Sequence, residues 1–371
     1  MFGKLKCEVI AVAACLGAFS TVAVGQGWQP EAPLRVALSQ LRACVDSSGN
    51  IYILGGVEHR GPATTRVEML AFDCTTSPPT YSGAWVDIAA MNSPRHAPAV
   101  VCAGDFIYAI GGSDSSVSLA SVERFDTQNP ASGWQLLPSS QWLTTARNNA
   151  PAVVDHAGRI YVIGGNGTPA VPGWLDTVEV YDPARPVNGW TVLPVTLHTG
   201  RVAHGAVTTP DGRIWAIGGE GGGPSGTHLD SVEIYDPCNP ALGWIPGPPI
   251  TGPNSNNDSA TLGADGNIYV AGGWLPGTTD RVVRYSFRDE QWQEVDALAA
   301  RPRSRPAMVL GKNGHVFAIG GGSKSGPFPD VESLNTVPCY ADGDISTGMC
   351  VLDIFDFLYF QNKFVNGCGC Q

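Results

Sequence analysis

The chain has 371 residues, of which 43% are hydrophobic and 15% are charged, and it contains 46 glycines and 29 prolines. So much glycine and proline excludes a helical bundle or a coiled coil, and the apolar fraction is too high for a mostly disordered chain. The formal net charge of −11 disfavours nucleic acid or an anionic membrane as the main partner. The length alone suggests two or three domains, but glycine-rich all-β folds often reach this size as one unit.

The first 25 residues have the features of an export signal. Lys4 and Lys6 make the start basic, an uncharged apolar run covers residues 9–24, and small residues precede Gln26. We therefore predict a signal peptide over residues 1–25 and a secreted chain, either extracellular or at the cell surface. No later stretch is apolar over the roughly 18 residues that a membrane span needs, so we expect no transmembrane segment after cleavage.

The cysteines are consistent with export. Ten cysteines, less Cys7 and Cys15 of the predicted signal peptide, leave eight in the mature chain. An even number of cysteines in an exported chain favours disulfide bonds, whose pairing the sequence leaves open. No Cys-x-x-Cys pair is accompanied by a second pair or by histidines at zinc spacing, which argues against a structural zinc site.

A pattern of roughly 50 residues repeats six times through the middle of the chain. Its most regular feature is a Gly-Gly pair directly after a short apolar run, which suits a strand buried on both faces. The pairs begin at Gly55, Gly111, Gly164, Gly218, Gly272 and Gly320. A second strand follows each pair, usually with a Val-Glu step, and in five of the six repeats a tryptophan follows the next turn. Each repeat therefore predicts four short strands.

This pattern resembles the kelch repeat, and the resemblance covers roughly Trp28 to Leu334. It implies an all-β fold, a six-bladed kelch-type β-propeller over residues 26–336, with the repeated tryptophans packed between blades. The glycines have a physical reason, because a residue without Cβ permits close approach of crowded strands. The sixth repeat has no tryptophan of its own, whereas Trp28 stands alone before the first repeat. We therefore predict that the segment around Trp28 forms the outer strand of the last blade and closes the ring.

The composition changes in the C-terminal tail, residues 337–371. Oxygen-bearing side chains alternate there ahead of an apolar stretch, which is the ligand chemistry that calcium requires. The residues that would hold calcium are Asp342, Asp344, Ser346, Asp353 and Asp356. The tail resembles one half of a dockerin of the cysteine-containing type, which implies a short α-helical, EF-hand-like unit and a cohesin-like anchoring partner. An alternative is a small apolar appendage that disulfides from Cys339 and Cys350 hold on the propeller.

One face of the predicted propeller gathers the candidate binding residues, because loops between second and third strands share it with the loops between blades. The basic residues expected there are Arg60, Arg95, His96, Arg147, Arg201, His204, His228 and Arg305, and the aromatic residues are Trp142, Trp174 and Trp274. The arginines either bond the carbonyl groups of neighbouring loops or form an electropositive mouth for acidic or polyhydroxylated ligands. The tryptophans either plug loops or form platforms for sugar rings.

The sequence favours a binding protein over an enzyme. Its scattered histidines do not indicate a copper site, and neither Gly-x-Ser-x-Gly nor a P-loop is present. Glu123, Glu179 and Glu233 occupy the repeated Val-Glu position, which favours a structural role. We expect a secreted protein, anchored at a surface or in an assembly, that binds a protein or a glycan on one propeller face. The alternatives are a secreted propeller enzyme that acts on carbohydrate, such as a sugar oxidase or a mutarotase, and a purely structural surface protein.

Overall fold

The computed structural model describes residues 27–337 except 82, 169–172, 223–226, 251–258 and 275–276. The predicted signal peptide and the predicted calcium ligands of the tail, from Asp342 to Asp356, lie outside the described residues. The described part consists of strands and short 3-10 helices, and none of its helices has the length and apolar character needed to cross a membrane.

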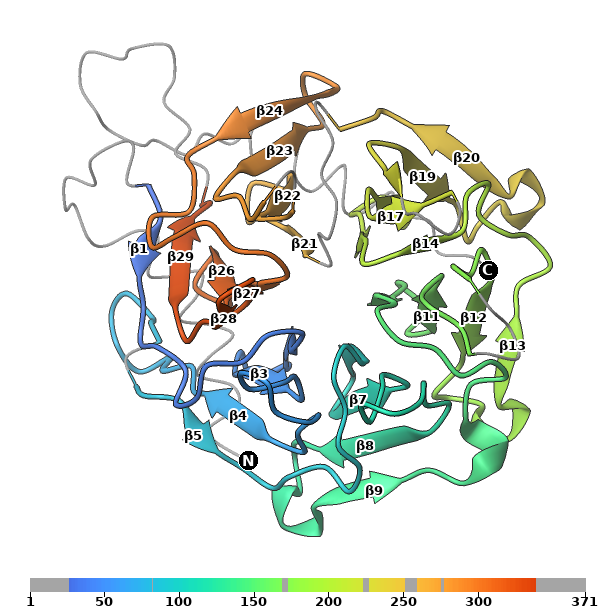
Figure 1. Cartoon of the computed structure of the whole chain (residues 1–371), viewed down its shortest axis with the longest axis horizontal. Helices are drawn as coiled ribbons and strands as arrows, with labels where there is room; N and C mark the ends of the chain where they lie inside the picture. Colours follow the sequence, from blue (N-terminus) through green and yellow to red (C-terminus); the bar gives the residue numbers. More distant parts are fainter. Residues whose placement is uncertain are drawn as a thin grey trace.

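Six antiparallel sheets of four strands each contain most of the strands of the described part, and they lie side by side around a common axis (Figure 1). We number these sheets along the chain. Sheet 1 has β2 (Arg42–Val45), β3 (Ile51–Leu54), β4 (Val67–Leu70) and β5 (Val86–Asp87). Sheet 2 has β6 (Ala99–Ala103), β7 (Phe106–Ile110), β8 (Val122–Asp126) and β9 (Trp134–Leu136). Sheet 3 has β10 (Ala152–Val154), β11 (Ile160–Ile163), β12 (Val178–Tyr181) and β13 (Trp190–Val192).

The other three sheets repeat this order. Sheet 4 has β15 (Gly205–Thr208), β16 (Ile214–Ile217), β19 (Val232–Tyr235) and β20 (Trp244–Gly247). Sheet 5 has β21 (Ala260–Leu262), β22 (Ile268–Ala271), β23 (Val282–Ser286) and β24 (Gln291–Val295). Sheet 6 has β25 (Ala307–Leu310), β26 (His315–Ile319), β29 (Val331–Asn335) and β1 (Gln29–Pro30).

Shorter elements decorate the loops. Two small ribbons are formed by β14 (Arg201–Val202), β17 (Glu220–Gly221) and β18 (Thr227–His228), and by β27 (Gly322–Ser323) and β28 (Gly326–Pro327). The 3-10 helices are η2 (Pro130–Ser132), η3 (Ser139–Gln141), η4 (Pro186–Asn188) and η5 (Pro240–Leu242).

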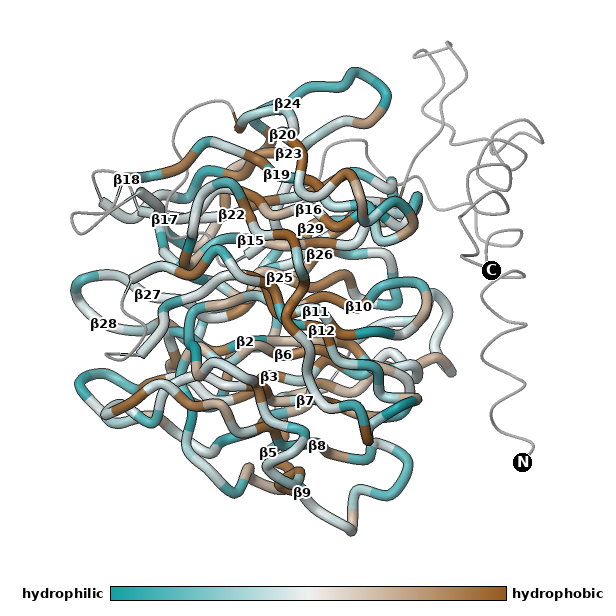
Figure 2. The backbone as a smooth tube through the Cα atoms, turned by 90° about the vertical axis from the view of Figure 1, so that its right-hand side faces the viewer, coloured by the Kyte–Doolittle hydropathy of each residue, from teal (hydrophilic) through white to brown (hydrophobic). Residues whose placement is uncertain are grey.

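The first strands of the sheets form a ring of contacts around the axis. Along this ring β2 contacts β6, β6 contacts β10, β10 contacts β15, β15 contacts β21, β21 contacts β25, and β25 returns to β2. A disulfide between Cys44 of β2 and Cys102 of β6 joins two of these strands covalently. The second strands are apolar and buried, as their sequences predict; in β3, β11 and β16 every residue is buried. Figure 2 shows these apolar stretches in brown within the body of the molecule, with hydrophilic teal in its loops.

The tryptophan at the start of each outer strand packs between sheets, as predicted. Trp134 of sheet 2 is buried, and its indole N–H donates to the carbonyl of Ala89 at 2.9 Å, in the segment that follows β5. Trp190 makes the equivalent bond to Gln141 at 3.0 Å, and Trp292 to Pro248 at 2.9 Å. Each of these three tryptophans therefore bonds its own sheet to the chain that leaves the preceding sheet.

The N-terminal strand closes the last sheet. Gln29 pairs with Ser333 and Pro30 with Glu332, so β1 is the outermost strand of sheet 6. Trp28, just before β1, is buried, and its indole N–H donates to the carbonyl of Asp296 at 2.9 Å. The prediction that the Trp28 segment supplies the outer strand of the last repeat is confirmed.

The Gly-Gly pairs mark close contacts between sheets. Gly164 has a φ of +57°, and a Cβ at this position would lie 2.6 Å from the carbonyl oxygen of Arg201, which belongs to the segment entering sheet 4. A side chain would therefore meet both backbone strain and a steric clash.

Candidate functional site

The sheets have two distinct ends. We call one end the loop face; it carries the loops after the six Gly-Gly pairs and the segments that lead into each first strand. Isolated bridges join these two sets of loops, as between His96 and Ser113 and between Asn148 and Asn166. The opposite end, the hairpin face, carries the turns between first and second strands and the loops between third and fourth strands.

A buried arginine organises the loop face of sheet 3. Arg147 donates to the carbonyls of Gly164 at 2.9 Å and Thr177 at 3.0 Å, and its Nη2 lies 2.7 Å from Oε1 of Glu179. The other carboxylate oxygen of Glu179 accepts the backbone N–H of Thr144 at 2.6 Å. Burial lowers the pKa of Arg147, while Glu179 favours the charged guanidinium. One arginine thus ties the Gly-Gly turn, the start of the third strand and the incoming loop together.

Three more sheets repeat this network. Arg95 binds Gly111, Ser121 and Glu123, and Arg201 binds Gly218, Ser231 and Glu233. In sheet 6 the equivalent residue is Arg303, which is fully buried and contacts Gly320, Asp330 and Glu332. Arg95, Arg147 and Arg201 therefore bond the carbonyl groups of neighbouring loops, which is one of the two roles that the sequence left open for them.

The network is altered in sheets 1 and 5. In sheet 1, Leu38 stands 17 residues before the first glycine, where Arg147 and Arg303 stand in their sheets. Glu68 of sheet 1 is nevertheless buried; it accepts the backbone N–H of Arg35 at 3.2 Å and lies 3.4 Å from Arg66. Burial raises the pKa of Glu68 because these two contacts compensate only part of the lost hydration. In sheet 5, Val283 replaces the glutamate, and the sequence has no arginine between residues 247 and 271.

A series of backbone hydrogen bonds, here called the belt, links sheets 1 to 4 at the inner edge of the loop face. Gln40, Ala97, Asn149 and Ala203 occupy equivalent positions in sheets 1 to 4, and each has a positive φ. Ala97 N–H donates to Gln40 at 2.8 Å, Asn149 to Ala97 at 3.0 Å, and Ala203 to Asn149 at 3.0 Å. Arg305 of sheet 6 has the same left-handed conformation, with a φ of 54°. The belt fixes the backbone of the axial entrance.

Basic side chains converge on this entrance. His96 is half-buried, with Nδ1 3.1 Å from Oε1 of Gln40, and its pKa is lowered by burial and by the charges of Arg305 and Arg42, which Asp114 partly offsets. His204 is completely buried; burial, Arg201 and Arg42 hold its pKa well below the usual range. Both shifts favour the neutral imidazole, and Arg42 and Arg305 carry the positive charges beside His96. We call these four residues the axial cluster.

Arg42 is the member of the axial cluster that the sequence does not reveal. It begins the innermost strand β2 and pairs with Leu54, the residue before the Gly-Gly pair. The equivalent residues are Ala99 in sheet 2, Gly205 in sheet 4 and Ala307 in sheet 6. Because the repeat places a small residue here, periodicity gives no reason to single out position 42.

The remaining predicted site residues are spread around the loop face. Arg60 and His228 are exposed, on loops of sheets 1 and 4. Trp142, Trp174 and Trp274 are half-buried and belong to different loops; Trp142 donates its indole N–H to Leu137 at 2.7 Å, and Lys324 lies 5.1 Å from the ring of Trp274.

A shallow hollow lies beside the loop of Arg60. It encloses about 300 Å³ and is lined by Glu58, residues 61–65 and Pro94. None of the three tryptophans lines it. Across the described residues, no group of three or more His, Cys, Asp or Glu side chains could hold a metal ion.

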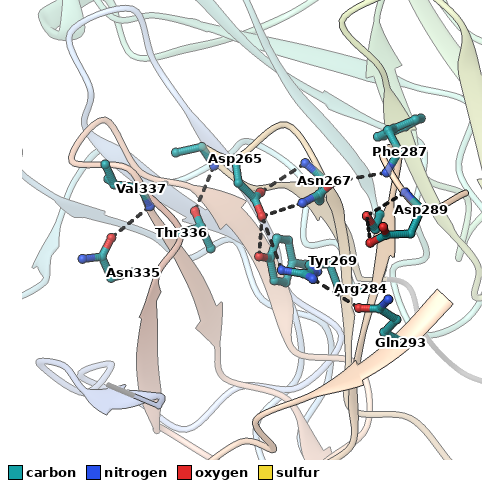
Figure 3. Close-up of polar contacts among 12 residues, drawn as sticks. Asp265, Asn267, Tyr269, Arg284, Phe287, Asp289, Gln293, Asn335, Thr336 and Val337 are labelled. Atoms are coloured by element: carbon teal, nitrogen blue, oxygen red, sulfur yellow. Dashed lines mark hydrogen bonds and ion pairs between the residues drawn. The ribbon is translucent and has the colours of Figure 1, made fainter. Parts of the chain in front are cut away.

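The hairpin face carries aspartates that are used within their own turns. In the turn before β22, Asp265 accepts hydrogen bonds from Asn267 at 2.7 Å and from the hydroxyl of Tyr269 at 2.8 Å, with Arg284 beside it (Figure 3). Asp46 and Asp155 bind Tyr52 and Tyr161 in the same way. Burial, followed by the adjacent carboxylate, raises the pKa of each of these tyrosines. These carboxylates order the turns.

Comparison with known proteins agrees with this architecture. The Kelch motif family model matches residues 94–131 and 201–240. Beta-scruin of Limulus polyphemus is 30% identical over 239 residues, covering 61% of this chain and 24% of the relative. Kelch-like protein 35 of Mus musculus is 27% identical over 220 residues, covering 58% of this chain and 34% of the relative. The chain therefore spans about a quarter to a third of the length of these curated relatives.

A solved structure shares the fold. The structure of YjhT aligns with a TM-score of 0.63 and 15% identity, over 81% of this chain and 95% of its own. At that identity the likeness concerns the fold alone. The matched motifs, the relatives and the ring of four-stranded sheets together support a kelch-repeat propeller.

Proposed function

We propose that this kelch-repeat propeller is a closed, six-bladed, secreted binding protein that holds a partner protein on its loop face. The observation that carries the proposal is the axial cluster. The charges of Arg42, which is 8% exposed, and of Arg305, which is half-buried, both act on His96, in a chain whose net charge is −11. A local positive site on an acidic protein attracts acidic groups of a ligand while the rest of the surface repels them. The partner segment is therefore rich in aspartate and glutamate.

Three further observations support parts of this proposal. The ring of first-strand contacts and the pairing of β1 with β29 support closure into six blades. Cys44 and Cys102 are joined by a disulfide, and Cys74 and Cys238 are disulfide-bonded as well. Because disulfides persist in oxidising compartments, this supports secretion. The similarity to kelch-repeat proteins supports a protein ligand in preference to a small molecule.

The test uses a displayed peptide library and a glycan array. We expect wild-type protein to select peptides rich in Asp and Glu, and the Arg42→Ala/Arg305→Ala variant to bind them at least tenfold more weakly. The matched control is Arg185→Ala/Arg288→Ala, which changes the net charge equally at exposed positions of the hairpin face and should leave binding unchanged. Arg305→Ala alone, at a half-buried position, serves if the double variant fails to fold. Absence of acidic binders, or selection of glycans only, would overturn the proposal.

We also propose that the tail anchors the protein with the help of calcium, using Asp342, Asp344, Ser346, Asp353 and Asp356. The alternation of oxygen side chains in the sequence supports this. Calcium is expected to protect the tail of the full chain from proteolysis, and Asp356→Ala to abolish that protection. Equal cleavage with and without calcium would contradict it, and would leave the loop-face proposal untouched.

A further inference from the structure

The chain leaves the propeller at a fixed point on the hairpin face. The hydroxyl of Thr336 accepts the backbone N–H of Ala264 at 2.9 Å and donates to the carbonyl of Gly314 at 2.7 Å, so it bridges sheets 5 and 6. The next residue, Val337, donates its backbone N–H to Asn335 at 2.9 Å. Figure 3 shows Thr336 and Val337 beside the turn that holds Asp265. The C-terminal segment therefore starts from the hairpin face.

Two disulfide-bonded cysteines lie on the same face. Cys74 lies in the loop between β4 and β5, which packs against the sheet 1 turn through a hydrogen bond from Tyr81 to Gly49 at 2.5 Å. Cys238 lies just after β19, whose last residue Tyr235 pairs with Ile214, the first residue after the sheet 4 turn. Both loops join third to fourth strands and so belong to the hairpin face.

These two cysteines are not bonded to each other. In the ring of contacts, sheets 1 and 4 are separated by two sheets on either side. A disulfide needs Cα atoms within about 7 Å, which sheets on opposite sides of the ring do not permit. The other described cysteines, Cys44 and Cys102, are bonded to each other. The partners of Cys74 and Cys238 must therefore come from the rest of the sequence.

We propose that Cys74 and Cys238 are cross-linked to cysteines of the C-terminal segment, which is thereby attached covalently to the loops of sheets 1 and 4. The sequence outside the described part contains Cys7, Cys15, Cys339, Cys350, Cys368 and Cys370. The first two lie in the predicted signal peptide, so the last four are the candidates. Each bond forms when two thiols lose two protons and two electrons to a disulfide-bearing oxidant, which is reduced to its dithiol.

Position along the chain decides which cysteine bonds which. Sheet 6, from which the segment leaves, is next to sheet 1, and Lys312 of sheet 6 donates its N–H to the Tyr81 hydroxyl at 3.0 Å. Cys74 is therefore near the exit and pairs with Cys339 or Cys350. Cys238 lies across the ring and pairs with Cys368 or Cys370. From Val337 to Cys368 an extended chain reaches roughly 100 Å, about twice the diameter of roughly 50 Å expected for a compact domain of this size.

The cross-links would bind two loops of the hairpin face, those of Cys74 and Cys238, to one segment of the chain. Neither cross-link involves a described residue of the loop face. This assignment does not depend on the loop-face proposal, since it rests on the cysteines and on the exit point.

The experiment is disulfide mapping of the purified full chain by non-reducing proteolysis and mass spectrometry. We expect one peptide containing Cys74 linked to Cys339 or Cys350, and another containing Cys238 linked to Cys368 or Cys370. A Cys74–Cys238 peptide, free thiols at both positions, or linkage between two molecules would overturn the proposal.

Variants of the full chain provide a second readout. After a cut within residues 338–349, the C-terminal fragment should stay attached without reductant and be released by reductant. In Cys368→Ser/Cys370→Ser, the thiol of Cys238 should become reactive. The control Cys44→Ser/Cys102→Ser should leave the fragment attached. Release of the fragment from the wild-type chain without reductant would contradict the cross-links.

Discussion

Arg147 and Glu179 form an ion pair whose two side chains are both excluded from solvent, with Nη2 and Oε1 2.7 Å apart. The buried pair is tolerated because both side chains make further hydrogen bonds. The guanidinium donates to the carbonyls of Gly164 and Thr177, and the carboxylate accepts two backbone N–H groups. Desolvating two charges costs several kcal/mol per ion, so such a pair specifies the geometry of the loop face more than it adds stability.

Removing one partner of this pair should be costly. Arg147→Leu leaves the Glu179 carboxylate buried without its counter-charge, and we expect a loss of about 3–5 kcal/mol in the free energy of unfolding. The double variant Arg147→Leu/Glu179→Val, which copies the Val283 of sheet 5, should recover at least about 1 kcal/mol of that loss. Urea unfolding of the two variants and of Glu179→Val measures the coupling. Additive losses would show that the two side chains act independently.

Glu68 should make stability depend on pH in the opposite sense from a paired carboxylate. Its pKa is raised in the folded state by burial, so the folded protein binds the proton more tightly than the unfolded chain does. This contribution to stability is fully present below the unfolded pKa of about 4.3 and is lost as the pH rises through the folded pKa. Glu68→Gln should therefore gain stability relative to wild type as the pH rises from 4 to 7.

Unfolding measured across that pH range tests this, with Glu179→Gln as the matched control in a sheet that has its arginine. The control should be less stable than wild type at pH 7, because it weakens the ion pair with Arg147. A Glu68→Gln difference that stays constant from pH 4 to 7 would refute the role of Glu68.

Two glycines separate backbone strain from steric clash. Gly133 and Gly164 have φ values of 65° and 57°, but a Cβ at Gly133 meets nothing within 4 Å, whereas at Gly164 it lies 2.6 Å from the Arg201 oxygen. Gly133→Ala should cost about 1 kcal/mol from the left-handed backbone alone. Gly164→Ala should cost roughly 1–3 kcal/mol more, since the neighbouring sheet must move. If thermal or urea unfolding shows equal losses of stability for the two variants, the neighbouring sheet moves away from the new Cβ without a measurable cost in free energy.

Trp28 should be essential for the integrity of sheet 6. It is 3% exposed and packs with Tyr269 and Leu334, so Trp28→Ala is expected to cost about 3–5 kcal/mol. Trp28→Phe keeps most of the apolar contact but loses the bond to Asp296, for a loss of about 1 kcal/mol from the hydrogen bond. Trp244→Phe is the control, because the Trp244 indole N–H has no hydrogen-bond partner among the described residues. Trp28→Phe should therefore lose more stability in urea unfolding than this control.

The repeat made the arrangement of the sheets predictable. Six Gly-Gly pairs fix the ends of the second strands, and five tryptophans mark the outer strands. The absence of a sixth tryptophan, together with the isolated Trp28, was enough to predict the position of β1. These features are visible in the sequence because the same residue types occupy equivalent packing positions from one sheet to the next.

The candidate site was less predictable, because its key residues depart from the repeat. Arg305 is predicted on the loop face from the sequence, whereas Arg303, the buried arginine of sheet 6, is not. Counting 17 residues back from Gly320 would have separated the two, since Arg147 and Arg201 stand at the same distance from their glycines. Nothing comparable identifies Arg42, whose charge acts on His96 and His204 from a position where other sheets carry small residues.

The pairing of β1 with β29 has a consequence for how the protein is made. Sheet 6 is completed only when Gln29, near the start of the described chain, meets Ser333, near its end. During synthesis the first four or five sheets can form as they emerge, but the ring remains open until the last repeat is available. Any chain that ends before β29 therefore leaves β1 without its partner strand, as an unpaired edge.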